Sequence, residues 1–171
     1  MLTMYCSSPV ALASSTFQRS LDTHRLLRYC FSPLMSMITA IHERWSLHDQ
    51  HKPVEAHILY STKVDKNLVH SNEILFLHRL KNYEEHHPER MSVTLFITGD
   101  YEKLEASEEL PWHFTRRLTK ADVLTVLGSF GKRQRTVCYV CGPPSMTDEL
   151  VHFLRSLDGL KASRVLCEKW W

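Results

Sequence analysis

The sequence predicts a single α/β domain of three layers, in which helices cover both faces of a mainly parallel sheet. From Pro33 onward, short β-branched and aromatic runs alternate with segments of helical periodicity, an order that is typical of parallel βα units. Glycine, proline and capping residues mark the junctions between these segments. The chain has 171 residues, 43% of them hydrophobic, which suits one globular domain.

The first predicted helix begins at Ser32 and Pro33, which suit its N-cap and first helical position, and it fades by 51–53. Its buried face is expected to contain residues at helical spacing: Leu34, Met37, Ile38, Ile41 and Trp45. A strand is predicted over 54–60, because this short run is rich in β-branched and aromatic residues.

A second helix is predicted from about Ser71 to His86, where Pro88 stops it. The next strand is expected over 92–98 and ends at Gly99-Asp100. Residues 100–117 have no clear period and are predicted to be a polar loop.

Thr119 and Asp122 predict a capping box that opens a short helix, which Gly128 ends. A strand follows over 136–141, and Gly142-Pro143-Pro144 turns the chain sharply. Ser145 is expected to cap the last long helix, with a final short strand over 164–167.

Ligands of such sheets bind at the carboxyl ends of the strands, so the residues that end each predicted strand are the candidates for function. These are Ser61-Thr62-Lys63, Thr98-Gly99-Asp100 and Cys141-Gly142-Pro143-Pro144.

Composition argues against several classes of function. A net charge of +2 gives no basic bias toward nucleic acid, and no apolar run approaches the ~18 residues of a membrane span. The five cysteines are an odd, scattered set and predict no disulfide framework. Cys138 and Cys141 stand three apart on a strand, so they are expected on opposite faces and not as a redox pair. The histidines lack zinc-like spacing to cysteines or acids, and no metal site is predicted.

Residues 1–31 differ from the rest of the chain. They are rich in serine and threonine and carry more arginine than acid, which resembles a mitochondrial transit segment. A disordered or aberrant leader remains the alternative, in which case the protein is expected in the cytoplasm. The domain itself is assigned to residues 32–171.

Three pieces of the sequence follow one another in a characteristic order: Pro33–Ile38 (PLMSMI), Ile58–Lys63 (ILYSTK) and Tyr139–Met146 (YVCGPPSM). Together they resemble the NAD(P)-binding half of the ferredoxin–NADP reductase superfamily. The ending Cys167–Trp171 (CEKWW) is similar to the end of the oxidoreductase NAD-binding domain-containing protein 1 family. The resemblance covers residues 33–171.

The resemblance implies a flavoprotein oxidoreductase in which NAD(P)H passes hydride to FAD, held by a β-barrel that precedes this domain. It places Cys141 beside the nicotinamide as the catalytic candidate. Ser61 and Lys63 would approach the adenosine ribose, although one lysine does not separate NADP from NAD. The other cofactor-binding candidates are Ser32 and Pro33 near the pyrophosphate, Gly142, Pro143, Pro144 and Met146 around the nicotinamide, and Glu168 and Trp171 near the flavin.

The sequence departs from this family in two places. The family's glycine loop is replaced by Leu27–Cys30, which removes the backbone freedom that a close approach to pyrophosphate needs. Residues 1–31 have no room for a flavin barrel, and the strand before the glycine loop is missing or replaced, with His24–Phe31 as its candidate substitute. Loss of that central strand would leave two facing sheet edges unpaired.

The chain is therefore expected to be inactive alone, with weakened NAD(P)H binding and with FAD only where the barrel is supplied. The alternative is a non-catalytic fragment that docks on another protein or on itself, through an exposed sheet edge or through Trp170-Trp171.

Overall fold

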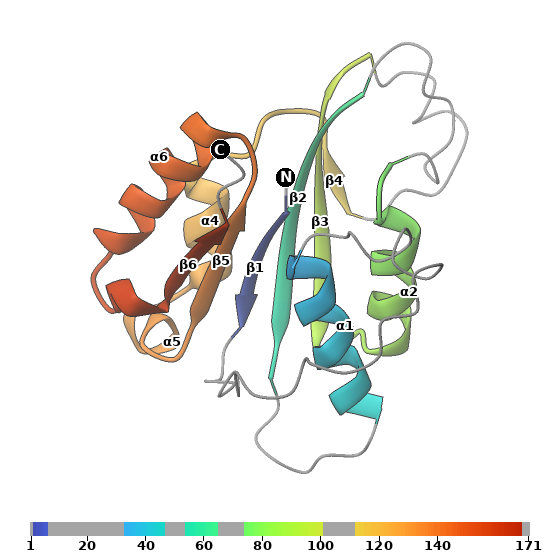
Figure 1. The fold of residues 1–171 in the computed structure, drawn as a ribbon, viewed down its shortest axis with the longest axis horizontal. Coiled ribbons are helices and arrows are strands. Elements are labelled where there is room, and N and C mark those ends of the chain that lie inside the picture. The colour runs from blue at the N-terminus through green and yellow to red at the C-terminus, as the bar shows by residue number, and fades with distance from the viewer. Residues whose placement is uncertain (1, 7–32, 47–53, 65–73, 101–111, 169–171) are drawn as a thin grey trace, which may run out of the picture.

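The computed structural model describes residues 2–6, 33–46, 54–64, 74–100 and 112–168. In these ranges the chain forms a six-stranded sheet with helices on both faces (Figure 1), which confirms the predicted fold class. The strands are β1 (Leu2–Cys6), β2 (Ala56–Val64), β3 (Met91–Gly99), β4 (His113–Phe114), β5 (Val137–Cys141) and β6 (Val165–Glu168). The helices are α1 (Pro33–Ser46), α2 (Leu77–His86), α4 (Lys120–Leu127), α5 (Phe130–Arg133) and α6 (Pro144–Arg155), with a 3-10 turn, η3 (Ala162–Arg164).

The strand order is β4-β3-β2-β1-β5-β6, and every neighbouring pair is parallel except the two that include β1. β1 lies between β2 and β5 and is antiparallel to both, with Met4 opposite Ile58 on one side and Tyr139 on the other. The central strand is thus replaced by Leu2–Cys6, whereas the predicted substitute, His24–Phe31, lies outside the described residues. The two facing edges that we expected to be unpaired are joined through β1.

Two separate cores lie on the two faces of the sheet, because neighbouring strand residues point to opposite sides. Ile58 packs under α1 and α2, whereas Leu59, the next residue, packs under α4 and α6. The first core holds Met35, Ile38, Trp45, Leu77 and Leu80 from its helices, and the second holds Val123, Leu127, Leu150, Val151 and Leu154.

The face of α1 is centred on a different methionine from the one predicted. Met35 and Ile38 are each 1% exposed, whereas Met37 is half-buried at the flank of this stripe. Ile41 and Trp45 are buried as expected, since they continue the same helical spacing.

The strands extend beyond their predicted ends. β2 continues through Ser61 and Lys63 to Val64, because β3 continues to pair with it as far as Gly99. β4 was not predicted, since its two residues gain a strand conformation only by pairing with Leu95 and Phe96 of β3.

The predicted cap of α4 is confirmed and that of α6 is wrong. Thr119 and Asp122 form the capping box, and Gly128, with a φ of 64°, ends the helix. α6 begins two residues earlier than expected, at Pro144, because proline in the first turn needs no backbone donor. Its N-cap is Pro143, so Ser145 lies inside the helix and its side chain makes no cap bond.

Candidate functional site

An open groove lies at the carboxyl ends of β2 and β3, where α6 and the segment before α4 approach the sheet. It is lined by residues of four segments: Ser61, Thr62 and Lys63, then Thr98, then Arg117 and Leu118, and lastly Pro143, Ser145, Met146 and Glu149. Ligands of doubly wound sheets bind at this edge. The groove therefore brings together four predicted site residues, Ser61, Lys63, Pro143 and Met146.

One wall of the groove consists of the last residues of β2 and β3. Because side chains alternate along a strand, Ser61 and Lys63 share the face of Leu59, which packs in the core under α4 and α6. Thr98 pairs with Lys63 in the register of the two strands, and its hydroxyl donates to the carbonyl oxygen of Thr62 at 3.3 Å. This wall is hydroxyl-rich and carries the Lys63 cation.

The opposite wall is the Gly142-Pro143-Pro144 turn and the first turn of α6. The Thr147 hydroxyl donates to the carbonyl oxygen of Gly142, and the Thr147 backbone N–H donates to that of Pro143, both at 3.0 Å. Thr147 is fully buried, so these two bonds hold the turn against the helix. Ser145 and Met146 line the groove, which places the positive end of the α6 dipole beside it.

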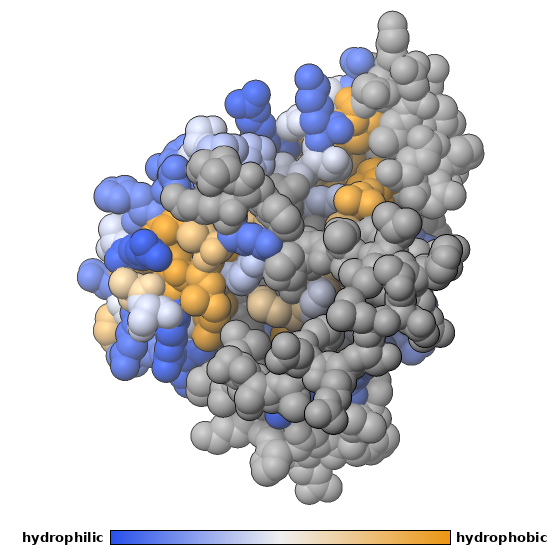
Figure 2. Space-filling model, in the orientation of Figure 1, coloured by the Kyte–Doolittle hydropathy of each residue, from blue (hydrophilic) through white to orange (hydrophobic). Residues whose placement is uncertain are grey.

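Cys141 lies on the other face of the sheet and does not line the groove. It is half-buried against the core under α1 and α2, and it is the backbone partner of Leu2 in β1 and of Glu168 in β6. Figure 2 shows hydrophobic residues over β5 and β6 on this face, with hydrophilic residues around them. Gly142 separates Cys141 in the chain from Pro143, which lines the groove.

A buried tyrosine on the same face of the sheet as Cys141 is hydrogen-bonded to the last described residue. The Tyr139 hydroxyl donates to Glu168 Oε2 at 2.7 Å, and burial, followed by this bond, raises the pKa of Tyr139. Glu168 is thus positioned beside Cys141 on the face of the sheet opposite the groove. Cys138 is fully buried under α6, on the opposite face from Cys141, as predicted for a pair three apart on a strand.

The remaining predicted site residues are only partly described. Pro33 begins α1, Gly142 is half-buried in the turn, and Pro144 is exposed at the first position of α6. Ser32 and Trp171 lie outside the described residues.

Sequence reasoning missed Arg117, Leu118 and Glu149. The first two follow β4, a strand too short to produce a pattern, and they lie in a segment with no period. Glu149 is an exposed residue on α6 that nothing in the sequence distinguishes from other surface acids.

Across the residues that the structure covers, no three histidine, cysteine or acidic side chains are arranged to hold a metal ion. None of the described helices is long and apolar enough to cross a membrane.

Three relatives named "Oxidoreductase NAD-binding domain-containing protein 1" match most of the chain. The Danio rerio protein is 27% identical over 143 residues, which are 82% of this chain and 48% of that protein. The Bos taurus and Homo sapiens proteins are 25% and 24% identical, again over 82% of this chain and over 42% of their own lengths. The chain therefore spans less than half of each relative.

No protein-family model and no solved structure matches the chain. The three relatives nevertheless confirm the resemblance that residues 33–171 show. The chain is similar in sequence to the oxidoreductase NAD-binding domain-containing protein 1 family.

Proposed function

We propose that this domain is the NAD(P)H-binding portion of a flavin-dependent oxidoreductase. The observation that carries the proposal is the groove, which joins Ser61 and Lys63 at the end of β2 to Pro143 and Met146 beside the glycine-proline turn. The relatives' names include an NAD-binding domain and an oxidoreductase, which supports a dinucleotide as the ligand.

The residues of the groove suit a dinucleotide. Ser61 and Thr98 offer hydroxyls for a ribose, and Lys63 offers a cation for a phosphate. The first turn of α6 adds a positive helix end on the other wall. In this arrangement the adenosine end lies over β2 and β3, and the nicotinamide end extends past Gly142 toward Cys141.

Reduced nicotinamide, when bound, would supply the hydride that a flavin accepts. The chain's own residues would bind and orient the dinucleotide, with Cys141 beside the nicotinamide and with Glu168 and Trp171 toward the flavin. Hydride transfer needs donor and acceptor at contact distance. We therefore propose that the flavin is held by a separate barrel domain and that this chain alone does not carry out the reaction.

Binding by the isolated chain is proposed to be weak, because Leu27–Cys30 stand where the resemblance to the reductase superfamily implies a glycine loop. Calorimetric titration of the full chain with NADH and NADPH tests this. Weak, saturable binding of at least one of them is the expected result. Low-micromolar affinity would show that the glycine loop is dispensable, whereas no saturable binding of either would overturn the proposal.

A mitochondrial location is proposed from the arginine-rich composition of residues 1–31. Expression of the chain with a fluorescent protein at its C-terminus tests it. Replacement of Arg19, Arg25 and Arg28 by glutamine, which leaves β1 in place, is expected to abolish the mitochondrial signal, and a diffuse signal from the intact chain would contradict the proposal.

The competing function is a non-catalytic docking fragment. Because β1 pairs with both β2 and β5, the edge strands of the sheet formed by the described residues are β4 and β6. The fragment would dock through one of these edges or through the Trp170-Trp171 end, which lies outside the described residues. Size-exclusion chromatography with light scattering separates the two functions. A monomer that binds nucleotide supports the enzyme, and a stable oligomer that binds none supports docking.

A further inference from the structure

We propose that a basic surface at the opposite end of the sheet from the groove binds membranes that contain anionic lipid. Two segments form this surface, residues 128–135 around α5 and residues 157–164 between α6 and β6. They lead into the amino ends of β5 and β6, which are parallel to each other (Figure 1). β5 also runs in the direction of β2, because β1 is antiparallel to both, and the groove lies at the carboxyl ends. A membrane at this end would therefore leave the groove open.

The basic surface has an excess of positive charge, although the whole chain carries a net charge of only +2. Arg135 and Lys161 are exposed, and neither forms an ion pair with a carboxylate of the described residues. Lys132 lies 3.9 Å from a carboxylate oxygen of Glu55. The cations of the two segments are Lys132, Arg133, Arg135, Lys161 and Arg164, and their one acid is Asp158. Clusters of about 4–8 lysines and arginines are typical of surfaces that bind anionic headgroups.

Hydrogen bonds to backbone carbonyl groups hold the two segments together. Arg133 Nε donates to the carbonyl oxygen of Gly128 at 2.9 Å, and its Nη1 donates to that of Asp158 at 3.5 Å. Nη1 of Arg164 donates to the carbonyl oxygen of Gln134 in the other segment. Since a carbonyl group has no net charge, both guanidinium groups keep their full charge in fixed positions. This order reduces the entropy that the surface loses on binding.

An aromatic side chain is exposed among these cations. Phe130 is 55% exposed, and its ring lies against Gly159 of the other segment, where an added Cβ would come within 2.9 Å of the ring. An exposed aromatic ring surrounded by lysine and arginine suits a membrane interface, because the ring enters the boundary below the headgroups while the cations bind the headgroups. An acidic protein would bind the cations but would give the exposed ring no role. The combination therefore favours a lipid surface.

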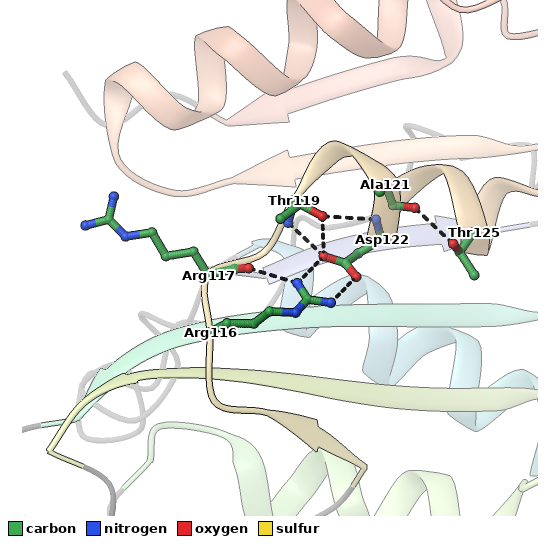
Figure 3. Close-up of polar contacts among 6 residues, drawn as sticks. All are labelled: Arg116, Arg117, Thr119, Ala121, Asp122 and Thr125. Atoms are coloured by element: carbon green, nitrogen blue, oxygen red, sulfur yellow. Dashed lines mark hydrogen bonds and ion pairs between the residues drawn. The ribbon is translucent and has the colours of Figure 1, made fainter.

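A second exposed aromatic residue, Trp112, lies in a different electrostatic environment. It is 73% exposed, and its ring meets the edge of Phe114, over which the Arg116 guanidinium lies. The two terminal nitrogens of Arg116 donate to the two carboxylate oxygens of Asp122 at 2.7 and 2.6 Å (Figure 3). Because this carboxylate neutralises the cation, Trp112 is not expected to bind anionic lipid, and it provides a matched control for Phe130.

Cosedimentation of the full chain with lipid vesicles tests the proposal. One set of vesicles is phosphatidylcholine alone, and the other contains about 30% phosphatidylserine. Binding to the anionic vesicles alone is expected, and it should weaken at high salt because the charges are screened. No binding to the anionic vesicles, or equal binding to both sets, would overturn the proposal. Binding to soluble polyglutamate but to neither set would show that the surface takes an acidic protein instead.

Single cation variants assign the binding to this surface. Arg135→Gln and Lys161→Gln are each expected to weaken binding to the anionic vesicles about fivefold. Arg79→Gln removes an exposed cation from α2 and is the matched control, with no change expected. If Arg79→Gln weakens binding as much as Arg135→Gln does, the chain responds to net charge and not to this surface, and the proposal is wrong.

Phe130→Ala tests the contribution of the aromatic ring. It is expected to weaken binding to the anionic vesicles about tenfold, because it removes apolar area that would leave water in the bilayer. Trp112→Ala is expected to leave binding unchanged. Thermal unfolding shows whether each variant is folded, and the two cation variants still test the surface if Phe130→Ala is not. Unchanged binding by a folded Phe130→Ala variant would contradict the proposal.

Discussion

Leu2 and Cys141 are backbone partners across β1 and β5, and the two strands run in opposite directions. Because β5 ends at Cys141, β1 begins at the same edge of the sheet that carries the groove. A parallel central strand would end at this edge and lead directly into a phosphate loop. β1 instead leads away from it, which supports the weak pyrophosphate binding that we propose.

Met4→Pro is predicted to destabilise the sheet strongly. Met4 lies at the middle of β1 with strands on both sides, and proline removes a backbone donor that a central strand needs. Size-exclusion chromatography and thermal unfolding are the measurements, and an oligomer or a large fall in Tm is expected. Met4→Val is the control and should retain a wild-type Tm. A Met4→Pro variant that also kept that Tm would show that β1 does not hold the sheet together.

Thr119→Ala is predicted to lower the free energy of unfolding by about 1 kcal/mol, because it removes the side-chain acceptor of the α4 capping box. Thr125→Ala is the matched control, since the Thr125 hydroxyl only donates to the carbonyl oxygen of Ala121 inside the same helix. Urea unfolding measures both. An equal change in the two variants would mean that the capping box does not stabilise α4.

The strand-helix order was predictable because it depends on local patterns. The α4 cap could be predicted from the sequence for this reason, since Thr119 and Asp122 lie within four residues of each other. Ser61 and Lys63 were found through the position of a strand end, even though the strand itself continues to Val64.

The features that were missed depend on contacts between distant segments. β1 was not predicted because Leu2–Cys6 becomes a central strand only by pairing with β2 and β5, which lie far along the sequence. Arg117 enters the groove only because β4 pairs with β3 and Arg116 binds Asp122. The side of the sheet on which Cys141 lies follows from β5, but its separation from the groove depends on where α6 packs.

Stability is predicted to fall as the pH drops below about 6.5, the ordinary pKa of histidine. Burial first, and then Lys132, lower the pKa of His57, whose Nδ1 lies 2.7 Å from the Ser92 hydroxyl oxygen. As the pH falls, His57 is therefore protonated in the unfolded chain before it is protonated in the folded chain. The free energy of unfolding decreases until the pH reaches the lowered pKa of His57 in the folded chain. Urea unfolding from pH 8 to pH 5 measures this.

His57→Gln is predicted to make that pH dependence shallower. His42 has a pKa that is lowered in the same direction, by burial and by its neighbours His87 and His86, so part of the dependence remains in the variant. A wild-type stability that rises between pH 7 and pH 5 would contradict the direction of both shifts.

Gly99→Ala is predicted to destabilise the end of β3 by about 2 kcal/mol. Gly99 has a φ of 95°, and an added Cβ would collide with the carbonyl oxygen of Val64. Gly131→Ala is the control, because Gly131 lies in the one-turn helix α5 and a Cβ added there would meet no atom within 4 Å. Thermal unfolding should show a lower Tm for Gly99→Ala and an unchanged Tm for Gly131→Ala.

Heteronuclear NMR during a titration with NADPH tests the central claim most directly, because it locates the ligand residue by residue. If the dinucleotide binds in the groove, the largest chemical-shift changes are expected at Ser61, Lys63 and Met146 and extend to Gly142. The chemical shifts of α2, on the other face of the sheet, are expected to stay unchanged. Saturable shifts centred on α2 or on the outer edge of β4, with Ser61 and Met146 unmoved, would contradict a dinucleotide site in this groove.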